Sequence, residues 1–339
     1  MGSEDIQACS YMDDNNRFAD AFNGTLFHGK NVINPNELVE ANKELLIPRR
    51  EDSKKVIRDN VKKWYKDMLL AILVIENQHG VDYHMTLRNM LAESMEYNRQ
   101  WKQIKKEHQK NKDLSGDEYV SGMYKTDKFT PVISLVIYYG NDEKKWDAAC
   151  NLHDLIQWNS DLEIWRPYIN DYKIHVLDYH NMDDFSAFKS QMKAVFQFLK
   201  CCKDGAELKK LFTEHSQEYY NIDEETYDFI SELSNSNELI KNKQAAKKKE
   251  GVFDMCKGLT ELINEGKAEG KAEGKAEFVG MVRGLMKKGQ TASDIYDIYK
   301  ASDSTDIAES YVEYICSLVE EHPDWTNLQI AESSILQKA

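Results

Sequence analysis

A carboxylate and an amide follow directly on the most aliphatic stretch of the chain. Residues Met68–Ile75 (MLLAILVI) run into Glu76-Asn77-Gln78 without an intervening turn residue. Because alternate residues of a strand point to the same face, we expect Glu76 and Gln78 to lie side by side. Asp59 stands 17 positions before Glu76, a separation that suits a neighbouring strand. The spacing therefore predicts that two carboxylates meet at one end of a sheet.

Two such carboxylates, together with the carbonyl of a strand residue, provide the hard oxygen ligands that Mg²⁺ prefers. This cation, or Mn²⁺ in its place, would lower the pKa of a water molecule and neutralise charge developing on a phosphodiester. Other interpretations stay open at this point. A Glu-x-Gln sequence also occurs at solvated strand ends, and Asp59 could cap a helix or pair with Arg58 or Lys62.

The surrounding elements predict an α/β fold. Met68–Ile75 has the length and composition of a buried central strand, and Pro131–Tyr139 (PVISLVIYY) has the same character. The segment from Met85 to Gln109 is helical in pattern. Two buried strands separated by a long helix indicate a β-α-β crossover. Further predicted elements are a strand at Tyr172–Asp178 and helices at Arg17–Gly29, Met182–Leu199 and Lys209–Leu233.

Charge is distributed unevenly along the chain. The formal net charge of −14 argues against a protein that coats nucleic acid. Two segments, Arg49–Lys63 and Arg99–Lys112, are nevertheless strongly basic. The second follows the candidate catalytic strand, which makes it the preferred phosphate-contacting surface.

Composition also bears on the cellular location of the protein. No apolar run approaches the ~20 residues that a membrane span needs. The N-terminus lacks the basic start and apolar stretch of a secretory signal. Six cysteines occur without a Cys-x-x-Cys pair. We therefore expect reduced thiols, no structural zinc site, no contact with a membrane and a cytoplasmic location.

A four-residue unit, Gly-Lys-Ala-Glu, is repeated three times in residues 265–277. Its glycines each cost a helix about 1 kcal/mol, and a period of four places like charges over one another. We interpret it as a solvated, semi-helical spacer. The alternative is a stem for a homo-oligomer, formed by the apolar flanks Met255–Ile263 and Phe278–Met286. The acidic tail from Thr291 has the pattern of short amphipathic helices.

Several separate motifs stand in a characteristic order. They are Arg17–Asn23 (RFADAFN), Val74–His79 (VIENQH), Tyr83–Met90 (YHMTLRNM), Ser121–Tyr124 (SGMY), Pro131–Gly140 (PVISLVIYYG) and the EGKAEGKAEG run. In this order they resemble the recombination-promoting nuclease (Rpn) and transposase-like family, a branch of the PD-(D/E)XK superfamily. The resemblance covers roughly residues 11 to 280.

The resemblance implies a restriction-endonuclease-like PD-(D/E)XK core, a mixed sheet flanked by helices, with a helical C-terminal extension. We therefore expect the chain to be divided into a core at 11–160 and a mainly helical continuation of this core at 161–240. A basic linker with the repeat spacer takes 241–277, and a small helical tail takes 278–339.

Family roles carry over to individual residues of this chain. Asp59 matches the metal-binding Asp of the PD position and Glu76 the (D/E) position, while Asp20 would be an auxiliary metal ligand. Gln78 replaces the usual Lys, and its amide can orient a water molecule or hold a phosphate. Arg58 stands where the motif has Pro. The residues expected to contact nucleic acid are Arg88, Arg99, Lys102, Lys106, Lys62 and Lys63.

The function implied is that of a Mg²⁺-dependent DNA endonuclease of low sequence specificity, linked to recombination or mobile elements. An alternative remains, in which a degenerate nuclease fold serves as a DNA-binding or assembly module without turnover. The net charge and the repeat fit that second interpretation.

Overall fold

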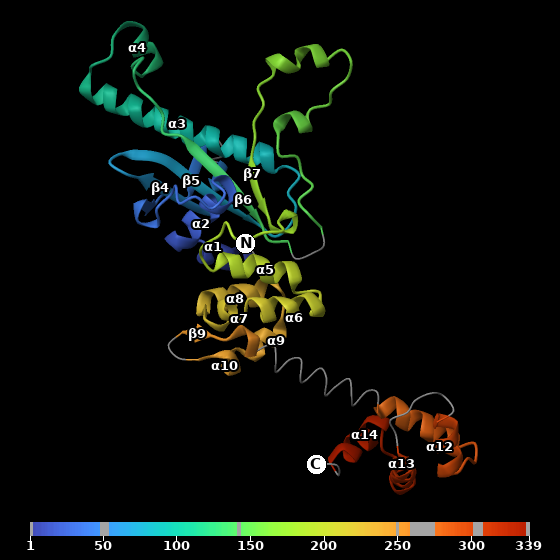
Figure 1. The fold of residues 1–339 in the computed structure, drawn as a ribbon. Coiled ribbons are helices and arrows are strands. Elements are labelled where there is room, and N and C mark those ends of the chain that lie inside the picture. Colours follow the sequence, from blue (N-terminus) through green and yellow to red (C-terminus); the bar gives the residue numbers. More distant parts are fainter. Residues whose placement is uncertain are drawn as a thin grey trace. The chain divides into compact units, whose positions relative to one another are not determined.

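The computed structural model describes residues 3–47, 54–140, 144–248, 251–257, 275–300 and 308–336. The chain forms two compact units, Met1–Cys256 and Lys257–Ala339. The first is built on a five-stranded mixed sheet with the order β1-β4-β5-β6-β7 (Figure 1). These strands are β1 (Leu38–Glu40), β4 (Asn60–Tyr65), β5 (Leu69–Gln78), β6 (Val132–Tyr138) and β7 (His175–Asp178).

Strand pairing sets the two directions of the sheet. β4 runs antiparallel to β5, with Asn60 opposite Ile75. β5 and β6 are parallel, with Glu76 opposite Val136, and β6 and β7 are parallel as well. The link from β5 to β6 contains α3 (Met85–Asn111). The crossover and the mixed α/β class predicted from the sequence are therefore confirmed.

Helices cover both faces of this sheet (Figure 1). α3 lies along one face, where Tyr97 packs on the apolar cluster of Val61, Ile72, Val74 and Val132. The other face carries α1 (Ser3–Tyr11), α2 (Asn15–Leu26) and α5 (Met192–Cys201). α2 begins at the cap Asp14, whose carboxylate accepts from the backbone N–H groups of the first turn.

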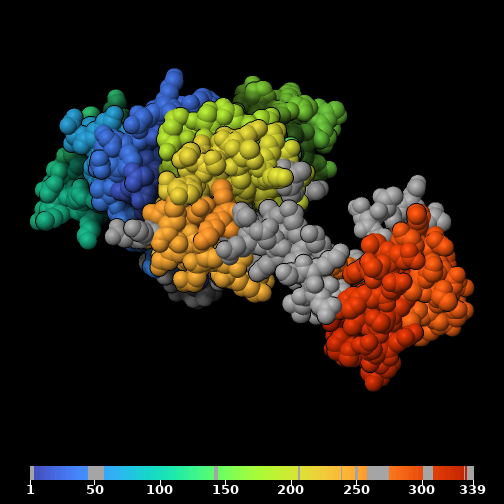
Figure 2. Space-filling model, turned by 60° about the horizontal axis from the view of Figure 1, so that its bottom comes forward, coloured from blue at the N-terminus to red at the C-terminus, as the bar shows by residue number. Residues whose placement is uncertain are grey.

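A layer of short helices follows α5 and completes the first unit. It comprises α6 (Gly205–Glu214), α7 (Ser216–Tyr220), α8 (Glu224–Leu233), α9 (Asn237–Lys241) and α10 (Lys243–Ala246), with the strand pair β8 (Ile222–Asp223) and β9 (Val252–Phe253). In Figure 2 this layer is the continuous yellow and orange surface. It is tied to the first helices, because Tyr11 stacks on Phe229 at 4.2 Å and Arg17 pairs with Asp223 at 2.9 Å.

The remaining elements of this unit are short. They are η1 (Pro35–Glu37), the antiparallel pair β2 (Glu44–Ile47) and β3 (Lys54–Ile57), α4 (Gly116–Ser121), η2 (Leu152–Leu155), η3 (Glu163–Tyr168) and η4 (Tyr179–Asn181). None of the helices in the described segments has the length and apolar character that crossing a membrane requires.

Two predicted helices are shorter than expected. The helix predicted at Met182–Leu199 begins only at Met192, because the preceding residues form η4 and an irregular loop. The helix predicted at Lys209–Leu233 is broken between α6 and α8, since β8 pairs with β9 there. Residues 241–256, assigned above to a linker, hold α10 and β9 and belong to the first unit.

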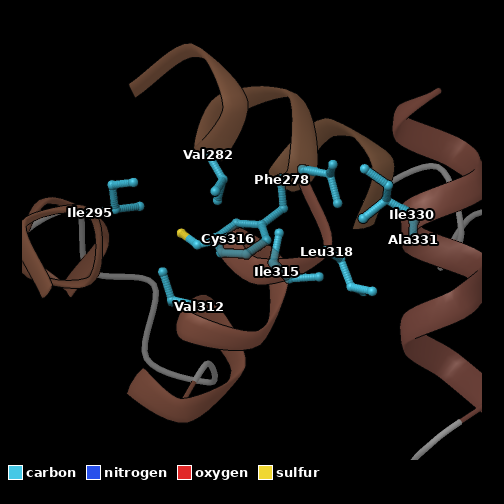
Figure 3. Packing of buried hydrophobic residues seen from close by; sticks show 10 residues of the cluster. Phe278, Val282, Ile295, Val312, Ile315, Cys316, Leu318, Ile330 and Ala331 are labelled. Atoms are coloured by element: carbon cyan, nitrogen blue, oxygen red, sulfur yellow. The ribbon is translucent and has the colours of Figure 1, made fainter. Parts of the chain in front are cut away.

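The second unit is a small helical bundle with its own core. A helix at 275–286 is followed by α12 (Ala292–Lys300), α13 (Glu309–Glu321) and α14 (Asn327–Leu336). Figure 3 shows Phe278, Val282 and Ile315 pointing into the same interior, together with Ile330 from α14. This packing buries Phe278, Val279 and Val282 of the flank Phe278–Met286 within the unit itself, whereas Met281 is exposed. The repeat as far as residue 274 lies outside the described residues.

Candidate active site

The register of β4 and β5 places Asp59 beside Glu76. Asn60 is the first residue of β4 and lies opposite Ile75, so Asp59 comes level with the next residue of β5. The backbone N–H of Asn77 donates to Oδ2 of Asp59 at 2.8 Å, which fixes the carboxylate against the end of β5. β5 continues through Gln78, so Glu76 and Gln78 are alternate residues of one strand.

A cavity of about 680 Å³ opens at this end of the two strands. Asp59, Glu76 and Gln78 all line it, so the structure brings the three predicted catalytic residues together. The wall also includes residues that the sequence analysis assigned no site role: Asp5, Asn77, His79, Asp82 and Asn89. Arg88, from the first turns of α3, lines the same cavity.

Glu76 is almost wholly buried, and two guanidinium groups balance its charge. Nε of Arg58 pairs with Oε1, and Nη2 of Arg88 lies 3.3 Å from Oε2. Arg58 is itself held from two sides, because its Nη2 donates to Oδ1 of Asn89 at 3.1 Å and to Oγ of Ser134 at 2.8 Å. A buried carboxylate needs such compensation to stay ionised. Arg58, in the place of the motif's Pro, therefore positions Glu76.

Asp59 is in a different electrostatic environment. Burial raises the pKa of Asp59 to about 6, and the charge of Glu76 adds to the effect. The hydrogen bond from the Asn77 backbone and the charge of Arg88 act in the opposite direction but are outweighed. Asp5 on α1 contributes a further repulsion. The cavity lining also holds more acidic than basic side chains, because Asp5, Asp59, Glu76 and Asp82 stand against Arg58 and Arg88.

A hard divalent cation would neutralise this excess of negative charge, so the chemical type of the donor groups fits Mg²⁺. Asp59 and Glu76 supply carboxylate oxygens beside the backbone of Asn77. Within the described segments, however, no group of three or more His, Cys, Asp or Glu side chains is arranged to hold a metal. A cation here would be held by two carboxylates, with water and backbone oxygen completing its shell.

Gln78 is directed towards its own backbone. Its Nε2 donates to the carbonyl of Asn77 at 2.8 Å. The side chain therefore lies beside the backbone oxygen that joins the two carboxylates in the proposed donor set. To act on a water molecule or a phosphate, the amide would exchange this local hydrogen bond for one to the substrate.

Asp20 does not line this cavity, which corrects its assignment as an auxiliary metal ligand. Its carboxylate accepts from the backbone N–H of Lys189 at 2.9 Å and from the N–H and Oγ of Ser190 at 2.7 and 2.6 Å. These donors belong to the loop before α5. These hydrogen bonds join α2 to that loop, and they occupy the acceptor positions of the Asp20 carboxylate.

The basic residues predicted to contact nucleic acid fall into different environments. Lys62 is fully buried, and its ammonium group reaches the carbonyl of Asp13 at 2.5 Å and Oε1 of Glu40 at 2.7 Å. Its assignment as a phosphate contact is therefore wrong, because β4 turns this side chain towards α2. Lys63, the next residue, is only partly exposed.

The other basic residues lie along α3. Arg88 is 40% exposed and also pairs with Asp82 at 2.9 Å. Arg99 pairs with Glu96 one turn away, whereas Lys102 and Lys106 are exposed. At 1.5 Å of rise per residue, the segment from Arg99 to Lys106 begins about 17 Å from Arg88 along the helix. Arg99, Lys102 and Lys106 are not among the residues that line the cavity.

One family model matches the chain, that described as "Putative transposase, YhgA-like", over residues 50–227. The matched segment begins before β4 and ends within α8, so it contains Asp59, Glu76, Gln78 and Arg88. No curated protein and no solved structure matched in the corresponding comparisons.

Proposed function

Because the chain belongs to this YhgA-like transposase family, an Rpn-type branch of the PD-(D/E)XK nucleases, we propose that it is a metal-dependent endonuclease that hydrolyses DNA phosphodiester bonds. The observation that carries the proposal is the meeting of Asp59 and Glu76 at the ends of adjacent strands in one polar cavity. A role in recombination or in mobile elements is part of the same proposal.

Asp59 and Glu76 would hold the cation, with the carbonyl of Asn77 as a further oxygen donor. When bound, Mg²⁺ or Mn²⁺ would lower the pKa of a water molecule and neutralise charge on the phosphate. The excess of carboxylates over arginines in the cavity lining supports this assignment, because uncompensated negative charge favours a divalent cation.

The chain's own side chains would perform the remaining tasks. Arg58 keeps Glu76 oriented, because its guanidinium is anchored on both α3 and β6. Arg88 is partly exposed at the cavity, and a phosphate would compete with Glu76 and Asp82 for its guanidinium. The amide of Gln78 would orient the attacking water. Contacts of this kind address the phosphate backbone, so we expect weak sequence preference.

A second function rests on a specific observation. Glu76 is already paired with two arginines, and Gln78 is engaged with the carbonyl of Asn77. A site arranged in this way could bind nucleic acid or support an assembly without turning over. Under this alternative the family fold is retained and catalysis is lost.

Nicking of supercoiled plasmid DNA separates the two functions. The purified wild type is compared with Glu76→Ala, Asp59→Ala and Asp20→Asn in Mg²⁺ or Mn²⁺. Catalysis by this site predicts nicking by wild type and by Asp20→Asn, and none by the other two. Equal nicking by all four would indicate a contaminating nuclease. Absence of nicking combined with a gel shift in Ca²⁺ would establish the binding module instead.

Metal binding can be measured apart from activity. Titration of the wild type with Mn²⁺, followed by calorimetry, should show a site that is lost in Asp59→Ala and Glu76→Ala and kept in Asp20→Asn. We also propose a reducing, cytoplasmic location, which the six free cysteines support.

A further inference from the structure

An excursion between β6 and β7 exposes large apolar side chains. It runs from Asn151 to Lys173, which pair with each other at its base, and we term it the η2–η3 arm. At its tip Ile164, Trp165 and Tyr168 are 68%, 57% and 79% exposed. We refer to these three residues as the knob. Trp165 and Tyr168 meet edge to face at 6.4 Å, so the knob is a single surface rather than scattered side chains.

The charges around the knob argue against nucleic acid as its partner. The arm contains the acidic residues Asp154, Asp161, Glu163 and Asp171, against the basic residues Arg166 and Lys173. Arg166 is moreover paired with Glu163 at 3.5 Å. A surface of this sign is repelled by a phosphate backbone, so the exposed aromatic rings are unsuited to stacking on nucleic acid.

A hollow of opposite character lies at the corner between α3 and α4. Its volume is about 410 Å³, and its lining includes Lys105, Lys112, Leu114 and Tyr119. The hollow therefore combines basic side chains with an apolar and aromatic wall. Tyr119 is 71% exposed, and its neighbour Val120 is 81% exposed.

The hollow has a fixed shape. The ring of His108, which also lines it, is held between Asp113 and Asp127 at 2.9 Å on either side. Gly122 adopts a positive φ of 76°, and a Cβ there would lie 2.7 Å from Cδ of Lys105. A larger residue at position 122 would thus enter the space that Lys105 occupies, so glycine keeps the corner open.

Knob and hollow are complementary but cannot meet within one chain. In both Figure 1 and Figure 2, the α3–α4 corner and the η2–η3 arm are separate projections of the first unit. We propose that the knob of one copy inserts into the hollow of a second copy, with the acidic residues of the arm facing Lys105 and Lys112. In the proposed arrangement a two-fold axis relates the copies, so that each knob enters the other copy's hollow and the pair of contacts closes the dimer.

The energetics favour a pair of contacts over one. Stable interfaces bury roughly 1,200–2,000 Å² in total, more than one knob of three side chains provides. Two-fold symmetry doubles the contact. An aromatic anchor in a pocket is also the usual centre of binding energy in an interface. This dimer is distinct from the oligomer stem predicted from the repeat and does not depend on the proposed nuclease activity.

Sedimentation analysis of the full chain over a range of concentrations tests the proposal. Wild type should sediment as a dimer. Trp165→Asp and Tyr119→Asp each remove one half of every contact, so each alone should raise the dimer dissociation constant on the order of 100-fold or more. Both positions are exposed, so the fold should be kept, and circular dichroism checks this.

Mixing the two variants gives the sharper outcome. A heterodimer of Trp165→Asp with Tyr119→Asp retains one intact knob and one intact hollow that face each other. The mixture should therefore associate more tightly than either variant alone. A wild type that stays monomeric would overturn the proposal, as would a dimer that neither variant weakens. A mixture that associates no better than its components would overturn the reciprocal arrangement. Loss of DNA binding in Trp165→Asp with an unchanged dimer would assign the knob to DNA instead.

Discussion

Replacing Asp59 by Asn should stabilise the metal-free protein above neutral pH. Burial and the charge of Glu76 raise the pKa of Asp59 to about 6, against an ordinary value of 3.8. The folded protein therefore binds this proton more tightly than the unfolded chain does. The contribution of protonated Asp59 to the free energy of unfolding is fully present below about pH 4 and is lost as the pH rises through 6. Above that pH the ionised carboxylate destabilises the fold.

The size of the effect follows from the same pKa. The difference between the pKa of Asp59 in the folded protein and its ordinary value corresponds to about 3 kcal/mol. Partial exposure of Asp59 reduces this to on the order of 2 kcal/mol. Asn keeps an oxygen for the N–H of Asn77, so the hydrogen bond need not be lost. At pH 8 Asp59→Asn should thus be about 2 kcal/mol more stable than wild type, with the two nearly equal at pH 4.

Urea unfolding in EDTA at pH 4, 6 and 8 measures this difference. Addition of Mg²⁺ at pH 8 should then stabilise wild type but not Asp59→Asn, because only the carboxylate attracts the cation. A variant that is less stable than wild type at pH 8 in EDTA would refute the electrostatic account of the site. Mg²⁺ stabilisation of equal size in both proteins would refute Asp59 as a metal ligand.

Three further outcomes are expected. Asp20→Ala leaves the N–H groups of the loop before α5 without their acceptor, so it should lower the free energy of unfolding by about 2–4 kcal/mol while leaving the affinity for Mn²⁺ unchanged. A loss of Mn²⁺ binding would restore its role as a ligand. Arg88→Ala should weaken DNA binding for all sequences alike and reduce the salt-dependence slope by about 1, as a fluorescence-anisotropy titration can measure; a sequence-dependent loss would contradict a phosphate contact. His108 should lose stabilising power as the pH rises above 6.5, because its hydrogen bonds with Asp127 and Asp113 outweigh its burial and raise its pKa. The melting temperatures of wild type and His108→Gln should therefore converge towards high pH, and a constant gap would refute the ion-pair clamp.

The strands and the pair Asp59–Glu76 were accessible from sequence because local patterns encode them. An aliphatic run such as Met68–Ile75 has few alternatives to a buried strand, and period-two geometry then places Glu76 and Gln78 on one face. The crossover through α3 follows from a long helix between two such runs. The position of Asp59 beside Glu76 requires only one further feature, the antiparallel register between β4 and β5.

The roles predicted for Asp20 and Lys62 were wrong because both side chains make contacts that no local sequence pattern contains. Asp20 meets Lys189 and Ser190, which lie about 170 positions further along the chain. Lys62 belongs to a basic run that suggests a solvated face, yet β4 directs it into the α2 side, where Asp13 and Glu40 satisfy its ammonium group. Helices cover both faces of the sheet, so Asn60, Val61 and Lys62 are all buried, and no alternation along the strand marks Lys62 as an interior residue.

The two carboxylates of the site have unequal surroundings, and this asymmetry divides their roles in the proposed function. Glu76 is enclosed by Arg58 and Arg88, and Arg58 is anchored through Asn89 and Ser134 to α3 and β6. The side chain of Glu76 is therefore part of a buried ion-pair network. Asp59 lies just before β4, where burial and the charge of Glu76 raise its pKa against the hydrogen bond from Asn77, so its ionised form destabilises the metal-free fold. If the proposed cation binds here, a site divided in this way would couple folding stability to metal binding through Asp59, and that is the position at which the coupling can be measured.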